Sequence, residues 1–69
     1  MLYFIEERSD GYAVIGKGND RAADVGMTAI QANKRAHELA GEDGWVDWKD
    51  LRGRFEKSCV CARCKKNRP

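Results

Sequence analysis

Apolar and polar residues alternate in two short runs at the start of the chain. The runs span residues 2–8 and 11–16, and Ser9-Asp10-Gly11 joins them. An Asp-Gly step between alternating runs is a strong hairpin signal, because glycine supplies the positive φ that tight hairpin turns require. The pattern therefore predicts two antiparallel neighbouring strands.

A helix with one apolar side is predicted over residues 29–40. Thr28 and Gln31 form a capping-box pattern at its start, and Gly41 stands where a C-terminal cap is expected. At about 100° per residue, the apolar positions gather on one half of this helix: Ala29, Ile30, Ala32, Ala36, Leu39 and Ala40. An alanine-rich face buries little area per residue, so larger side chains are expected to supply much of the core: Phe4, Ile15, Trp45, Trp48 and Phe55.

The remaining segments complete a small α+β fold. Residues 17–26 show no clear period and predict a loop or an irregular strand extension, whereas residues 45–48 predict a third strand. A turn around residues 51–53 leads into a possible fourth strand near residues 54–58. The fold class is α+β, a two-layer sandwich of ββα followed by one or two antiparallel strands. We divide the chain into a domain over residues 1–58 and a cysteine-bearing tail over residues 59–69.

Length and composition indicate one small domain with a thin core. The chain has 69 residues, of which 42% are hydrophobic and 35% charged, and its mean hydropathy is -0.71. Domains of this size usually need a disulfide, a metal or a partner for stability. The apolar run at residues 2–5 is too short for a signal peptide and is followed by Glu6 and Glu7. We therefore expect a cytoplasmic protein with reduced cysteines and no membrane partner.

Three cysteines near the end of the chain form the pattern C-x-C-x-x-C. Cys59, Cys61 and Cys64 have spacing typical of a zinc knuckle, but a structural zinc site normally has four ligands. His37, the only histidine, is the candidate fourth ligand and lies at the edge of the apolar helix face. We predict one zinc ion per chain. Alternatives are free thiols in a mobile tail, redox or intermolecular use of the cysteines, an ordinary boundary histidine, and a fourth ligand from Asp47, Asp50, water or a second chain.

Charge is distributed unevenly along the chain. Residues 51–69 carry seven basic and one acidic residue, a net charge of +6, whereas residues 1–50 carry six and ten, a net charge of -4. This density predicts salt-sensitive contact with phosphates, and an exposed Trp45, Trp48 or Phe55 could stack on unpaired bases. The alternative is a solvated, solubilising end. The candidate nucleic-acid contacts are Arg54, Lys57, Arg63, Lys65, Lys66 and Arg68.

The chain resembles a family of small bacterial and phage proteins known as a domain of unknown function. The resemblance rests on the run from Gly11 to Ala22, G-Y-A-V-I-G-K-G-N-D-R-A, and on the alanine-rich helix led by Thr28. Family members show a G-W-A-V hairpin strand, a G-N-x-R-A loop, an A-x-x-x-A helix and a closing G-R strand. The resemblance covers about residues 1–56, implies the fold and supplies no activity. The cysteine-bearing end lies outside it.

The motifs favour a binding module over an enzyme. The glycines at positions 16 and 18 fit no phosphate-loop pattern, and a nucleophile built from His37 and a tail thiol lacks an orienting residue. We predict a zinc-stabilised, non-enzymatic module that contacts nucleic acid or a nucleoprotein through its basic tail. The alternative is a protein-binding inhibitor, for example a phage-encoded anti-CRISPR factor, that uses an acidic face: Asp20, Asp24, Glu42 and Asp43.

Overall fold

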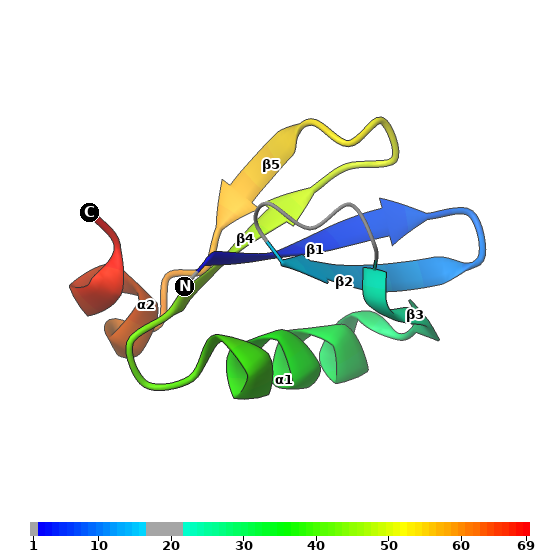
Figure 1. The fold of residues 1–69 in the computed structure, drawn as a ribbon. Coiled ribbons are helices and arrows are strands. Elements are labelled where there is room, and N and C mark those ends of the chain that lie inside the picture. Colours follow the sequence, from blue (N-terminus) through cyan, green and yellow to red (C-terminus); the bar gives the residue numbers. More distant parts are fainter. Residues whose placement is uncertain (1, 17–21) are drawn as a thin grey trace.

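A five-stranded mixed sheet forms the body of the protein in the computed structural model, which describes residues 2–16 and 22–69. The spatial order of the strands is β3-β2-β1-β4-β5. The strands are β1 (Leu2–Arg8), β2 (Gly11–Gly16), β3 (Ala22–Met27), β4 (Trp45–Lys49) and β5 (Phe55–Ser58). The helices are α1 (Ala29–Ala40) and α2 (Ala62–Asn67). Helix α1 lies under one face of the sheet, and α2 lies beside the end of the sheet where β4 begins (Figure 1).

The N-terminal hairpin is confirmed. Strands β1 and β2 pair antiparallel, with Ile5 opposite Val14 and Arg8 opposite Gly11. Gly11 has a φ of 130°, which a side chain would strain, and a Cβ there would lie 3.0 Å from the backbone of Gly26 and Met27. Glycine is thus required both by the turn and by the close approach of the end of β3.

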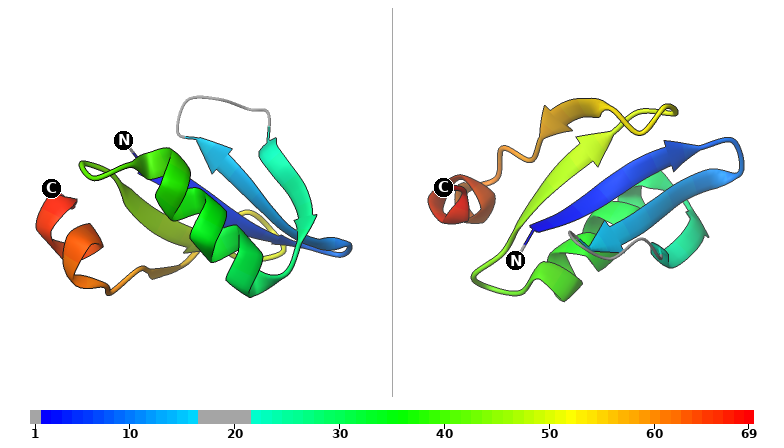
Figure 2. Two further views of the ribbon diagram at one scale, coloured as in Figure 1. Left: turned by 90° about the horizontal axis from the view of Figure 1, so that it is seen from below. Right: turned by 45° about the horizontal axis from the view of Figure 1, so that its top comes forward.

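The predicted α+β two-layer class is also confirmed, but the prediction of antiparallel strands after the helix was wrong for the first of them, and the sheet mixes strand directions. Strand β4 runs parallel to β1, whereas β5 pairs antiparallel with β4. The parallel pair follows from the connection, because a helical crossover returns the chain to the end of the sheet from which the next strand must start. Helix α1 makes this crossover and runs diagonally across the sheet (Figure 2).

Helix α1 has the predicted bounds and the predicted caps. The Thr28 hydroxyl accepts a hydrogen bond from the Gln31 backbone N–H at 3.2 Å, and the Gln31 side chain accepts one from the Thr28 N–H at 3.1 Å. Gly41 ends the helix with a φ of 74°. These caps fix the start and end of α1 and so determine where His37 lies along it.

We expect Thr28→Ala to lower the free energy of unfolding by about 1 kcal/mol, because an orphan amide of the first turn loses its acceptor. Chemical denaturation monitored by circular dichroism measures this loss. Thr28→Ser keeps the hydroxyl and serves as the control, so an equal loss in both variants would contradict the capping role.

Of the two alternatives for residues 17–26, a loop or an irregular strand, the structure supports the irregular strand where it describes the chain. Residues 22–27 form β3, an edge strand, while residues 17–21 lie outside the described part of the chain. The pairing of β3 with β2 shifts register twice, between Tyr12 and Val14 and between Val14 and Ile15. Such shifts remove the strict alternation by which a strand is detected in a sequence.

The core prediction is confirmed for three alanines of the helix, wrong at Ile30, and wrong about which sheet residues are fully buried. The alanine stripe Ala32, Ala36 and Ala40 is buried, but Ile30 is 84% exposed. The fully buried large side chains that meet this stripe are Ile5, Val14, Val46 and Cys64, not the aromatic residues. Trp45 and Trp48 are half-buried against this cluster, Phe4 and Ile15 are also half-buried, and Phe55 is 65% exposed. Because neighbouring residues of a strand face opposite sides, burying Ile5 and Val14 under α1 turns Phe4 and Ile15 away from it.

Candidate metal centre

Three separate elements bring one histidine and three cysteines to the same place. His37 lies in the second half of α1, Cys59 directly follows β5, Cys61 caps the start of α2, and Cys64 lies within α2. The hairpin formed by β4 and β5 explains this convergence, since it places Ser58 opposite Asp47 near the beginning of β4. The Cys59 N–H continues the pairing by donating to the Val46 carbonyl at 3.0 Å. The chain therefore leaves the sheet beside the C-terminal half of α1.

The four ligand atoms lie at distances that suit one tetrahedral ion. His37 Nε2 is 3.4 Å from Cys59 Sγ, 3.8 Å from Cys61 Sγ and 3.4 Å from Cys64 Sγ. All four atoms lie within 4.8 Å of one another. Zinc bonds of about 2.3 Å to sulfur and 2.0–2.1 Å to nitrogen place tetrahedral N and S ligands about 3.6 Å apart. The cluster thus has the dimensions of a metal site, and all four predicted ligands belong to it.

The His37 ring is held with Nε2 directed at the sulfurs. Nδ1 lies 2.7 Å from the Asn33 carbonyl oxygen, one helical turn earlier. A carbonyl can only accept, so Nδ1 carries the proton and Nε2 presents its lone pair to the cluster. Backbone carbonyls commonly fix the orientation and tautomer of metal-binding histidines in this way.

Two of the thiols have strongly and oppositely displaced pKa values. The Cys64 N–H donates to Cys61 Sγ at 3.5 Å and is the main reason why the pKa of Cys61 falls to about 6. Burial raises the pKa of the Cys64 thiol to about 12. The buried Cys64 sulfur lies beside the readily ionised Cys61 sulfur, and this pair favours a bound cation. The positive charge of a cation would stabilise both thiolates and so allow both thiols to lose their protons.

The last residues of the chain are fastened to the domain by more than the cysteines. The Asn67 amide donates to the carbonyls of Glu42 and Gly44 in the α1–β4 connection. The Arg68 guanidinium donates to the Cys59 carbonyl, to the Val46 carbonyl at 3.2 Å and to the Asp47 carboxylate at 2.9 Å. These hydrogen bonds therefore also position on β4 the segment that carries Cys61 and Cys64.

Helix α2 is the part of the site that the sequence pattern does not predict. Six residues are too few to show helical periodicity, and no glycine or proline marks the start of the helix. The available signals were Cys61 as a side chain able to cap the Cys64 N–H, and Lys65 and Lys66 in the last turn. Neither signal identifies Cys64 as a core residue, yet its side chain is fully buried.

The carboxylates considered as alternative fourth ligands are engaged elsewhere. Asp47 pairs with Arg68, and Asp50 accepts from the backbone N–H groups of Arg52 and Arg54, both at 2.9 Å. Those hydrogen bonds, from Arg54 first, lower the pKa of Asp50 and stabilise the β4–β5 turn. His37 is the nitrogen or oxygen ligand that the structure brings to the three sulfurs.

The residues predicted to bind nucleic acid lie on two elements. Arg54 and Lys57 belong to the β4–β5 hairpin, and Arg63, Lys65 and Lys66 belong to α2; all five are exposed. Arg68 is half-buried because of its hydrogen bonds to β4. The Arg63 guanidinium also donates to the His37 carbonyl at 3.2 Å, which ties α2 to α1.

The residues of the predicted acidic face are placed as follows. Asp24 forms an ion pair with Arg35 at 2.7 Å, which raises the pKa of that guanidinium. Glu42 and Asp43 are exposed in the connection between α1 and β4, and Asp20 lies outside the described residues. The glycine loop at positions 16–18 is described only at Gly16, the last residue of β2.

Two further findings bear on the class of protein. Over the part of the chain that the structure describes, neither helix has the length and apolar content needed to cross a membrane. Comparison of the chain with protein-family models, with curated proteins and with solved structures finds no match. The resemblance to a domain of unknown function therefore stays a prediction.

Proposed function

We propose that this protein is a zinc-stabilised, non-enzymatic module that binds nucleic acid or a nucleoprotein through its basic C-terminal segment. The observation that carries the proposal is the cluster of His37 and three cysteines at tetrahedral distances. Its position between α1 and the α2 segment makes it a clamp that joins the basic segment to the domain.

The ligand set favours zinc and a structural role. Three thiolates and one imidazole match a Cys₃His zinc site, whereas calcium and magnesium take oxygen ligands. Four protein ligands fill a tetrahedral coordination sphere, while catalytic zinc sites keep one position for water or substrate. The site therefore supports folding, and the binding surface must lie elsewhere.

The exposed cations favour a polyanionic partner. Arg63, Lys65 and Lys66 project from one short helix whose position the metal and Arg68 fix. Basic side chains held on a rigid element can neutralise phosphates and release their counterions, which makes binding dependent on salt. Zinc knuckles with flanking basic residues suit RNA and single-stranded nucleic acid.

We expect the zinc-loaded protein to bind a fluorescein-labelled oligonucleotide with an affinity that falls as salt is raised. A variant carrying Arg63→Gln, Lys65→Gln and Lys66→Gln should bind more weakly. The slope of log K against log salt should become shallower by roughly 2, since each lost single-strand phosphate contact contributes about 0.7. Fluorescence anisotropy at several salt concentrations measures both quantities.

Lys34→Gln is the matched control, because Lys34 is an exposed lysine on α1, outside the basic segment. It should change the slope little. If the triple variant binds as the parent does, with the same slope, the basic segment is not the binding surface.

A further inference from the structure

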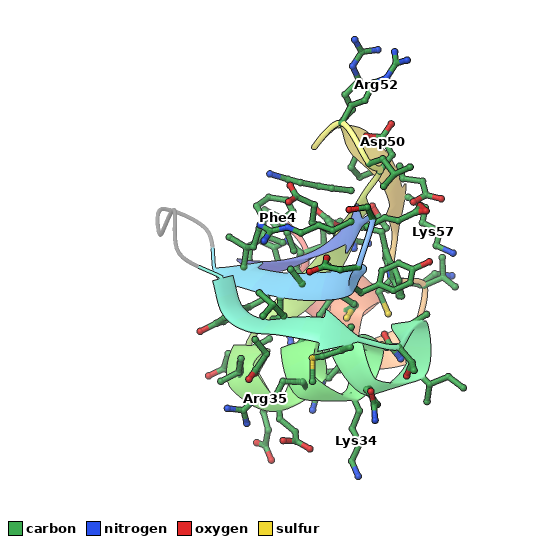
Figure 3. The ribbon with its side chains drawn as sticks, turned by 90° about the vertical axis from the view of Figure 1, so that its right-hand side faces the viewer. Phe4, Lys34, Arg35, Asp50, Arg52 and Lys57 are labelled. Carbon is green, nitrogen blue, oxygen red and sulfur yellow. The ribbon has the colours of Figure 1, made fainter. Side chains whose placement is uncertain are left out.

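In the part of the chain that the structure describes, no helix covers one of the two faces of the sheet (Figure 1). Helix α1 covers the opposite face, and Figure 3 shows Phe4 on the side of the sheet away from α1. Strand pairing places Asp47 beside Phe4, and Phe55 opposite Lys49. Residues paired in this way point to the same side of a sheet, and so do Asp47 and Lys49, which are two residues apart on β4. Phe4, Lys49 and Phe55 therefore share the uncovered face. We call it the open face.

Two aromatic rings on the open face are accessible to a partner. Phe55 lies in β5, the strand at one edge of the sheet, and its side chain is 65% exposed. Phe4 is half-buried, and the Lys49 ammonium lies over its ring, 4.0 Å from the centroid. Exposed aromatic side chains flanked by cations are the elements of a surface on which bases stack.

Two carboxylates of the open face, those of Glu6 and Asp47, are paired with arginines, while the Lys49 ammonium is not. Glu6 forms an ion pair with Arg8 at 2.9 Å, and Asp47 is paired with Arg68. Within residues 2–16 and 22–69, Lys49 makes no ion pair, and its ammonium lies over the Phe4 ring. The surface therefore offers positive charge next to its aromatic rings.

The β4–β5 turn adds two further cations at one end of this face. Arg54 directly precedes Phe55 and is exposed, and Arg52 projects from the tip of the turn (Figure 3). The Asp50 carboxylate accepts hydrogen bonds from the backbone N–H groups of Arg52 and Arg54 and so fixes the turn that presents both side chains. A phosphate chain crossing from the turn to β1 would meet positive charge along its path.

We propose that the open face binds single-stranded nucleic acid, with one base stacked on Phe55, a second on Phe4, and phosphates against Lys49, Arg52 and Arg54. This inference rests on the proposed function and names its partner. Lys49 has a flexible four-carbon stem, so its ammonium can move from the Phe4 ring to a phosphate when a base arrives.

The spacing of the two rings selects a single strand over a duplex. Phe4 and Phe55 are two strand spacings apart across the sheet and two residues apart along it, which places them roughly 12 Å apart. Successive bases in a duplex are stacked about 3.4 Å apart and paired edge to edge, so their faces are not available to separated rings. Bases that splay apart can occupy both rings.

The test compares Phe55→Ala with the parent, both zinc-loaded, in anisotropy titrations with a 15-nucleotide oligo-dT and with a duplex of equal length. Phe55→Ala should weaken oligo-dT binding about tenfold or more, whereas Phe55→Tyr should retain most of the affinity because it keeps a ring. Ile30→Ala is the control, since Ile30 is 84% exposed on α1 and far from the open face in the fold. It should leave binding unchanged.

The outcomes separate this inference from the proposed function. If Phe55→Ala binds oligo-dT as the parent does while the Arg63, Lys65 and Lys66 variant loses binding, the open-face inference fails and the proposed function stands. A parent protein that prefers the duplex also overturns the inference alone. If the zinc-loaded parent binds neither probe, both fail. Equal thermal melting curves for parent and Phe55→Ala ensure that a weaker affinity reports the lost ring.

Discussion

Removing the metal with a chelator is expected to lower the melting temperature of this protein by roughly 15–30 °C. A ligand present at a thousand times its dissociation constant stabilises the native state by about 4 kcal/mol. In a domain of this size each kcal/mol corresponds to roughly 4–8 °C. The effect should be large because the site joins α1 to the segment that buries Cys64 in the core. Differential scanning calorimetry with and without chelator measures it.

Cys61→Ser is the matched variant for this prediction. The Cys61 side chain is exposed, so its loss removes a ligand without opening a cavity, unlike the loss of the buried Cys64. The variant should melt near the chelated parent, and chelator should then lower its melting temperature little further. Native mass spectrometry should find one zinc ion per parent chain. Two results together would refute the structural site: native mass spectrometry that finds no zinc on the parent, and a parent melting temperature that chelator leaves unchanged.

Ile5→Ala is expected to lower the free energy of unfolding by about 2–5 kcal/mol, the range for truncating a buried isoleucine. Ile5 is fully buried and lies between Val14 on β2 and the alanine stripe of α1. The alanines cannot fill the space that the truncated side chain would leave, because they are short and the helix already lies close to the sheet. Because small domains have only a few kcal/mol in reserve, this variant should retain little of the parent's stability.

Phe55→Ala provides the comparison for Ile5→Ala. The ring is larger than the isoleucine side chain but 65% exposed, so its removal should change the free energy of unfolding by less than about 0.5 kcal/mol. Urea denaturation of both variants under zinc-saturated conditions separates the two cases. A larger loss for Phe55→Ala than for Ile5→Ala would mean that the core lies on the other face of the sheet.

The regular elements were predictable because their signals are local. The Asp-Gly turn, the Thr28 capping box and the glycine after Ala40 are short-range patterns, and the structure confirms each of them. The direction of β4 and the burial of Ile5 in place of Phe4 depend on how the helix crosses the sheet. No window of the sequence contains that information, because both residues are apolar and only one can face α1.

The candidate metal ligands could be predicted from the chemistry of their side chains rather than from the fold. Three cysteines within six residues leave few uses, and one histidine in the chain leaves one candidate for the nitrogen ligand. The supporting contacts could not be predicted in the same way. The Asn33 carbonyl behind His37, and the bonds from Asn67 and Arg68 to β4 and its preceding loop, exist only once distant segments have met.

A metal bound at the cluster would also determine how the edge of the sheet can open. An ion that joins His37 to Cys59 would close a loop around residues 38–58, which include β4 and β5. Closing a loop removes conformations from the unfolded chain, as a cross-link does. An edge strand normally frays from a free end, but the end of β5 at Ser58 is held by Cys59. While the ion is bound, β5 can separate from β4 only from the turn at Arg52, so fluctuations of this strand run in one direction, from the turn toward the clamp.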